Sequence, residues 1–349
     1  MKKNLLILFG GESSEHEVSE ISAYNVIKAI DTDEYNIFKI GITKKGIWYL
    51  YEGDNEFIKG GKWEQFNNKR AFISPCKSYS GIVVENQDKF EKIPIDVCYP
   101  VLHGKNGEDG TIQGLLTLAG IKFVGCGCMS SALCMDKVMA KMIFEENGIP
   151  HTPYVYMKKG DNIEEFIKEV AEKIGYPCFV KPSNAGSSVG AKKVKEEAEL
   201  FGAINDAFCH DYKVLVEKFI NCREIETAVM GNFEISVAGP GEITSESEFY
   251  DYDTKYITNS NVGYVIPADL SASQTHKIVE YAKKAYKALD CKGLSRIDFF
   301  LSKDDGEIYL NEINTLPGFT DISMYPKLFM SEGVSYKTIV SELLKNASL

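Results

Sequence analysis

Strand-like apolar runs alternate with amphipathic stretches of helical length over the first third of the chain. Residues 5–9, 35–42 and 95–99 are apolar enough to predict buried strands, whereas 18–30 and 111–119 repeat apolar residues at the spacing of a helix face. This strand–helix–strand order predicts an open α/β sheet in which residues 5–9 form a parallel strand.

Two polar segments follow predicted strands of this sheet. Gly10-Gly11 comes after the first strand, and the loop 103–110 follows the strand at 95–99. Because ligands of open α/β sheets gather beyond the carboxyl ends of the strands, both segments are candidate binding sites. The polar stretch 54–79 has no clear period, and we predict an irregular insertion there with little catalytic role.

The remaining pattern predicts two further units. Residues 136–147, 163–174, 271–289 and 335–344 have helical patterning, and 213–220 is a strand. We therefore predict three domains: residues 1–125, a small central unit at 126–220, and an α+β unit at 221–349. A polar, tyrosine-rich stretch at 244–263 predicts a lid over the site.

Composition narrows the class of protein. A net charge of −11 and an isoelectric point near 5.2 argue against a nucleic-acid surface. Nine scattered cysteines without a pairing framework are typical of a reducing cytoplasm. The apolar start is too short for a signal peptide, and no window is long enough to span a membrane. We expect a cytoplasmic protein that binds neither nucleic acid nor membrane.

The segment 181–190 places a lysine before a loop of small residues, between two runs of β character. Such a loop can turn several backbone N–H groups toward one point and hold an anion, and Lys181 adds a positive charge. A nucleotide phosphate is the expected ligand. The segment is neither a Walker A loop nor a Gly-x-Gly-x-x-Gly turn, and a plain Gly/Ser-rich hairpin turn is the alternative.

A predicted hairpin carries a second group of polar residues. Strands at 294–301 and 307–313 flank a turn at Asp304-Asp305-Gly306. Side chains alternate along a strand, so the hairpin can bring together Asp298, Glu312 and Asn314. Two carboxylates and an amide suit Mg²⁺ that phosphates also hold, whereas solvated charges on a surface hairpin are the alternative.

These segments resemble the D-alanine–D-alanine ligases of the ATP-grasp superfamily. The resemblance covers nearly the whole chain, and although each block is weakly specific, their joint order is very specific. The blocks are residues 9–19, 102–110, 131–137, 181–190, 249–256, 296–298 and 311–318. The resemblance implies an ATP-grasp fold with an N-terminal Rossmann-like α/β domain, a small central domain and a C-terminal α+β domain.

The resemblance also implies an activity. ATP would phosphorylate the carboxylate of one D-alanine, and the amine of a second D-alanine would displace phosphate, giving D-alanyl-D-alanine for peptidoglycan synthesis. The implied cofactors are ATP and two Mg²⁺ ions, which Mn²⁺ can replace, and the implied assembly is a homodimer.

Roles follow from the same resemblance, position by position. ATP would be bound by Lys137, Lys181, Ser188, Glu217, Phe219, Ile220, Glu224 and Lys255. The two metal ions would be held by Asp298, Glu312 and Asn314, with Glu312 bridging. Catalysis would use Glu15, Ser187, Arg296, Tyr256 and the Gly318 amide. Substrate would lie beside His103, Ser323 and Met324.

Three other functions stay open at this stage. D-Alanine–D-serine ligases of the glycopeptide-resistance type share several blocks, although Met324 suits an alanine methyl group better than a serine hydroxyl. Other ATP-grasp ligases of carboxylates and amines lack the blocks around Glu15 and Tyr256. A nucleotide-binding regulatory module would not need the full set of Arg296, Asp298, Glu312 and Asn314.

Overall fold

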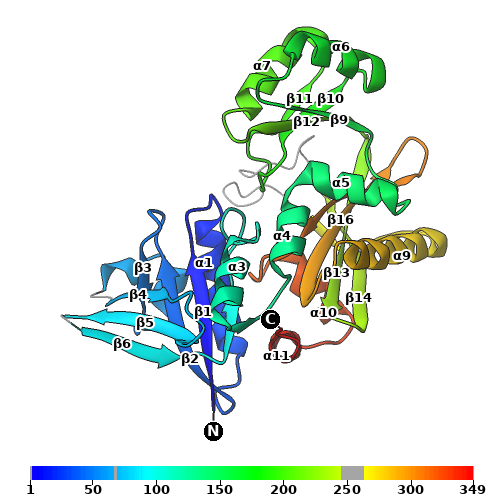
Figure 1. The fold of residues 1–349 in the computed structure, drawn as a ribbon. Helices are drawn as coiled ribbons and strands as arrows, with labels where there is room; N and C mark the ends of the chain where they lie inside the picture. The colour runs from blue at the N-terminus through cyan, green and yellow to red at the C-terminus, as the bar shows by residue number, and fades with distance from the viewer. Residues whose placement is uncertain (1, 67–68, 88, 245–262, 349) are drawn as a thin grey trace.

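The computed structural model describes residues 2–66, 69–87, 89–244 and 263–348, which form three sheets (Figure 1). The predicted lid, with Lys255 and Tyr256, lies outside the described residues except for its ends at Thr244 and Gly263. None of the helices within the described ranges combines the length and the apolar character needed to cross a bilayer.

The first unit is built on an eight-stranded sheet of order β6-β5-β4-β3-β2-β1-β7-β8. Strand β1 pairs in parallel with β2 and β7, as the sequence predicts, and every side chain from Leu5 to Phe9 is buried. The pairings from β2 to β6 are antiparallel. The strands are β1 (Lys3–Gly10), β2 (Tyr35–Ile42), β3 (Trp48–Leu50), β4 (Lys69–Ile73), β5 (Gly81–Asn86), β6 (Lys89–Pro94), β7 (Val97–Pro100) and β8 (Lys122–Phe123), with helices α1 (His16–Ala29) and α3 (Thr111–Ala119).

The prediction of an irregular insertion at 54–79 is wrong in part. This segment contains α2 (Glu56–Lys59), a 3-10 turn (Trp63–Gln65) and strand β4. Trp63 is fully buried against Phe9, and its indole N–H donates to Glu20 at 2.6 Å. A single aromatic residue without periodic neighbours gave no signal of this burial in the sequence.

The central unit carries a four-stranded antiparallel sheet of order β11-β10-β12-β9, with two helices packed on it. Its apolar core consists only of residues between 155 and 216. The elements are β9 (Tyr154–Lys158), α6 (Ile163–Lys173), β10 (Cys178–Pro182), β11 (Lys192–Val194), α7 (Glu197–Ala207) and β12 (Lys213–Lys218).

The third unit carries a five-stranded antiparallel sheet of order β15-β14-β13-β16-β17. Helices α4 and α5 pack with α9 against this sheet, although they precede the central unit in the chain (Figure 1). The elements are α4 (Cys128–Met135), α5 (Lys137–Glu146), β13 (Cys222–Gly231), β14 (Ile235–Thr244), β15 (Gly263–Val265), α9 (Ala272–Ala288), β16 (Leu294–Ser302), β17 (Ile308–Asn314), α10 (Met324–Ser331) and α11 (Tyr336–Lys345).

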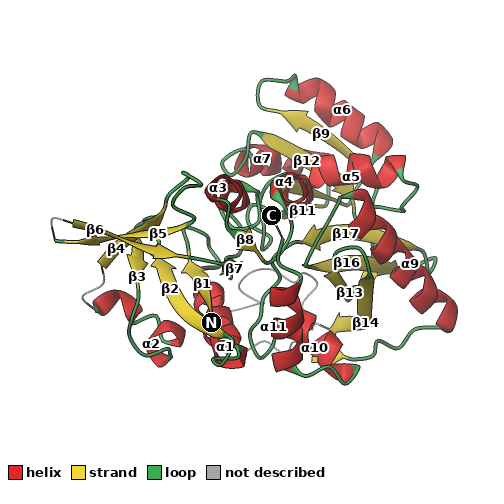
Figure 2. Ribbon diagram, turned by 60° about the horizontal axis from the view of Figure 1, so that its bottom comes forward, coloured by secondary structure: helices red, strands yellow, loops and turns green. Residues whose placement is uncertain are grey.

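The first and third units share one apolar core. Residues of α1 and β1 pack together with residues of α10 and α11, so one buried cluster runs across both units (Figure 2). The end of the chain returns to the first sheet, where Ser348 exchanges two backbone hydrogen bonds with Phe123. The predicted domain limits at 125 and 220 stay predictions.

Candidate active site

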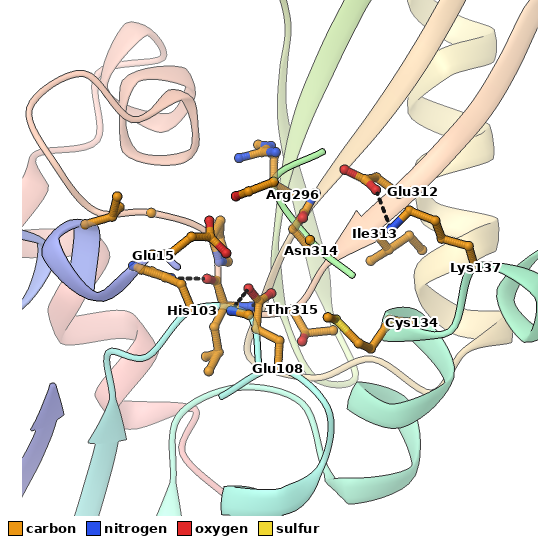
Figure 3. A pocket seen from close by; sticks show the side chains of 18 residues that line it. Glu15, His103, Glu108, Cys134, Lys137, Arg296, Glu312, Ile313, Asn314 and Thr315 are labelled. Atoms are coloured by element: carbon orange, nitrogen blue, oxygen red, sulfur yellow. Dashed lines mark hydrogen bonds and ion pairs between the residues drawn. The ribbon is translucent and has the colours of Figure 1, made fainter. Parts of the chain in front are cut away.

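Two adjoining cavities share Lys137, Ser187 and Glu312 as a common wall. All three units line the first cavity, whereas no residue of the first unit lines the second. The first cavity is shown in Figure 3. Predicted residues that line the first cavity are Glu15, His103, Lys137, Ser187, Arg296, Glu312, Asn314 and Gly318. Those that line the second are Lys137, Lys181, Ser187, Ser188, Glu224 and Glu312.

The loop after β10 has an unusual backbone conformation. Ser187 and Ser188 both have positive φ angles, 51° and 59°, which non-glycine residues rarely adopt. Lys137, at the first position of α5, donates to the carbonyl of Ala185 at 2.8 Å and lies 3.3 Å from a carboxylate oxygen of Glu312. Loop, helix start and β17 therefore converge on one lysine.

A buried ion triad supports the second cavity. The Glu217 carboxylate is 2.6 Å from the Lys181 ammonium and 2.9 Å from that of Lys141. Burial alone would raise the pKa of Glu217, but the two lysine charges outweigh it and lower that pKa to about 2. Each carboxylate oxygen of Glu217 thus forms an ion pair with one lysine, Oε1 with Lys141 and Oε2 with Lys181.

The other predicted nucleotide residues surround this triad. Phe219 and Ile220 follow β12 directly and are partly buried, and Phe219 packs near Phe179. Glu224 lies on the adjoining strand β13 and lines the second cavity. Phe219 and Ile220, by contrast, line neither of these two cavities.

The hairpin β16–β17 brings the predicted polar residues together. Asp298 stands opposite Glu312, and Arg296 stands opposite Asn314, as alternation predicts. Arg296 donates to both oxygens of Asp298 at 2.8 and 2.7 Å, and Asn314 donates to Asp298 at 2.9 Å. Arg296 also lies 3.1 Å from Glu226 on β13, which sequence reasoning missed.

This donor set fits a divalent cation held jointly with phosphates. Asp298, Glu312 and Asn314 offer two carboxylates and an amide oxygen on neighbouring strands. In this structure each carboxylate is paired with a protein cation, Asp298 with Arg296 and Glu312 with Lys137. Within the described ranges, no group of three or more His, Cys, Asp or Glu side chains is placed to hold a metal by itself, without phosphate ligands.

Glu15 stands at the opposite wall of the first cavity, just before α1. Its carboxylate comes so near Gly104 that a Cβ there would lie 2.9 Å from Oε2, and Gly104 has a φ of +64° besides. Glu15 also approaches Gly186 of the central loop, where the corresponding distance is 3.5 Å. A carboxylate thus reaches from the first unit toward the loop that holds Ser187.

Gly318 lies in the turn that follows β17. An added Cβ would stand 2.7 Å from Ser323 Oγ, so only glycine fits without displacing Ser323. Ser323 in turn accepts the N–H of Thr320 at 2.9 Å. Met324 begins α10 and is 3% exposed, packed in the shared core near Gly241.

Besides Glu226, two further ionisable residues at the site escaped the sequence prediction. Glu108 lines the first cavity, and burial together with the charge of Glu15 raises its pKa to about 7. Lys141 lies one turn after Lys137 on α5 and is fully buried. Its i,i+4 spacing from Lys137 was the available signal, because two lysines so spaced share a helix face.

Family models match most of the chain. One described as "D-ala D-ala ligase N-terminus" matches residues 4–126, and one described as "D-ala D-ala ligase C-terminus" matches residues 143–345. The chain is 49% identical to a D-alanine–D-alanine ligase of Ruminiclostridium cellulolyticum, covering 99% of this chain and 95% of that protein. It is 48% identical to that of Clostridium acetobutylicum, covering 100% and 98%.

Solved structures agree in fold. The VanG D-Ala:D-Ser ligase from Enterococcus faecalis has a TM-score of 0.91 at 41% identity, with 99% of each chain covered. The D-alanine–D-alanine ligase from Coxiella burnetii has a TM-score of 0.86 at 32% identity, covering 99% of this chain and 93% of that one. The chain belongs to the D-alanine–D-alanine ligase family.

Proposed function

We propose that this protein joins two D-alanines into D-alanyl-D-alanine at the expense of ATP, in the cytoplasm and for peptidoglycan synthesis. The observation that carries the proposal is the pair of cavities with one shared wall. The second cavity gathers lysines and a phosphate-type loop, and the first presents the Glu15 carboxylate to an ammonium group. Nucleotide and amino acid would meet at Lys137, Ser187 and Glu312.

The first step transfers the terminal phosphoryl group of ATP to the carboxylate of one D-alanine. A carboxylate has no usable leaving group for an attacking amine, and the acylphosphate provides one. Lys137 and Lys181 would neutralise the phosphates, while the amides around Ser187 and Ser188 cover the terminal phosphate. Glu217 holds Lys181 in place and, with Phe219, Ile220 and Glu224, would border the nucleoside.

In the second step the amine of the second D-alanine attacks the acylphosphate carbonyl. Charge develops on the carbonyl oxygen, and the Arg296 fork and the Gly318 amide would stabilise it. Glu15 would hold the ammonium of the first substrate, and Ser323 the carboxylate of the second. The lid would exclude water, while its Lys255 would bind ATP and its Tyr256 would link the lid to Glu15, as the resemblance implies.

Asp298, Glu312 and Asn314 would hold two Mg²⁺ ions, or Mn²⁺ in their place. Bound there, the ions would neutralise charge on the phosphate oxygens. Both ring nitrogens of His103 form hydrogen bonds within the protein, one with the Leu316 carbonyl and one with the Ser22 hydroxyl. We therefore propose that His103 supports the residues of the site and does not contact the substrate itself. A homodimer also stays a proposal.

A second candidate is D-alanine–D-serine ligation, since the VanG D-Ala:D-Ser ligase has a TM-score of 0.91 with this chain. The resemblance places Met324 beside the second substrate, where an apolar side chain would favour alanine instead, although Met324 lines neither of the two cavities. A serine hydroxyl buried there without a partner costs roughly 1–3 kcal/mol, which corresponds to about a ten- to hundredfold preference for D-alanine.

Competition among acceptors tests both candidates. The purified protein is given ATP, Mg²⁺ and equimolar D-alanine, D-serine and D-lactate, and the products are counted by mass. We expect mainly D-alanyl-D-alanine, with ADP release that D-alanine starts and L-alanine does not. A majority of D-alanyl-D-serine would favour the second candidate, and ADP release without any ligation product would contradict both.

A further inference from the structure

Glu108 belongs to the loop between β7 and α3 and has no part in the chemistry described above. Its two carboxylate oxygens accept hydrogen bonds from two different backbone segments. Oε1 accepts the N–H of Gly104 at 3.1 Å, and Oε2 accepts the N–H of Leu316 at 2.9 Å. One side chain therefore joins the first unit to the turn that follows β17 in the third.

The carbonyl of Leu316 is held as well. It lies 2.8 Å from Nδ1 of His103, and because a carbonyl can only accept, Nδ1 carries the hydrogen. Burial lowers the pKa of His103, so the ring is neutral and Nε2 accepts from the Ser22 hydroxyl at 3.2 Å. Ser22 Oγ then accepts the N–H of Phe319 at 3.0 Å.

These contacts fix the turn 316–319 at both of its ends. Glu108 and His103 hold the peptide groups of Leu316, and Ser22 holds that of Phe319. The Gly318 amide lies between the two fixed points. Since these three residues come from the first unit, the direction of that amide depends on a contact between units.

We propose that Glu108 is a positioning residue, which orients the turn 316–319 and with it the Gly318 N–H toward the reacting carbonyl. The inference rests on the proposed function, in which that amide stabilises the developing oxyanion. Displacement of a catalytic group by about 1 Å can lower the rate about a hundredfold.

The side chain must be a carboxylate because two N–H donors converge on it. Glutamine of the same shape offers one acceptor oxygen, and its amide NH₂ would face the second N–H as another donor. Keeping a charge here is unfavourable, since burial and Glu15 raise the pKa of Glu108 to about 7. An uncharged side chain would be easier to accommodate if the position only filled space.

The test is steady-state kinetics of Glu108→Gln. We expect kcat for D-alanine-dependent ADP release to fall about 10- to 100-fold, while the KM values for ATP and for the first D-alanine change less than about threefold. Glu12→Gln is the matched control, because exposed Glu12 also contacts this loop, at Asn106 Nδ2 (3.0 Å), but from outside the cavity. The control should keep wild-type kcat.

A second variant separates this role from a folding defect. Ser22→Ala removes the hydroxyl that accepts the N–H of Phe319, and the kcat of this variant should fall in the same way. If both residues act through one turn, the double variant should lose less than the product of the two single losses.

Losses that multiply would contradict a shared turn. A large rise in the KM for D-alanine with normal kcat would show that Glu108 binds substrate directly, which also overturns the inference. An active wild type with a fully active Glu108→Gln variant overturns the inference alone. A wild type that D-alanine does not activate would overturn the proposed function, and this inference with it.

Discussion

Arg296 shows how much one side chain depends on its geometry. Its planar fork spans both oxygens of Asp298 while the same group faces Glu226, so the guanidinium is fixed where the three strands β13, β16 and β17 meet. A lysine would keep the charge but not the two parallel donors. Replacing Arg296 by lysine therefore tests whether the positive charge is sufficient or whether the two parallel N–H donors are also needed.

We expect Arg296→Lys to fold normally and to lose about 10²- to 10³-fold in kcat, as when an oxyanion donor is removed. Arg223→Lys is the matched control, since Arg223 makes a similar two-pronged pair with Glu242 at 2.8 and 2.5 Å. The measurement is kcat of both variants under saturating ATP. Near-normal turnover in Arg296→Lys would mean that only the charge is needed.

The ion triad belongs to the scale of elements, because it ties α5, β10 and β12 together through Lys141, Lys181 and Glu217. Removing its single anion leaves two buried ammonium groups close together. We expect Glu217→Gln to lower the free energy of unfolding by roughly 3–5 kcal/mol at pH 7.

The pH dependence of this loss has a definite sign. The pKa of Glu217 is about 2 in the folded protein, below its value of 4.5 in the unfolded chain, so its stabilisation is complete above about pH 4.5 and is lost as the pH falls toward 2. Denaturation by urea at several pH values should show the wild type and Glu217→Gln converging in acid. Glu165→Gln, on the exposed face of α6, should run parallel to the wild type throughout.

Elements with a strong period were predictable from sequence, and cross-unit contacts were not. Strand alternation and a hairpin turn predicted that Asp298, Glu312 and Asn314 come together, and the register of the hairpin brings them together. The hydrogen bond between Glu108 and Leu316 joins residues 208 positions apart, and no local pattern encodes such a pairing. The burial of Trp63 was also missed, since its partner Glu20 is 43 positions away in the sequence, on α1.

At the scale of the whole molecule, the described residues form unequal cores. The first and third units share one cluster, whereas the central sheet has a separate, smaller one. We expect hydrogen exchange in mild denaturant to show β1 and β13 losing protection together, and β10 and β12 losing it earlier. Loss of protection in all three sheets at one denaturant concentration would show that the central unit does not open alone.

The separate core of the central unit has a consequence for recombination between relatives. Because the apolar cluster of the central sheet contains no residue of the outer units, we expect that the segment 152–218 can be replaced by that of another member of the family without disturbing the remaining cores. The graft must keep the polar partners of α5, namely Ser183, Lys213 and Glu217. Neither outer unit is expected to be exchangeable alone, since residues of both pack together in one shared cluster.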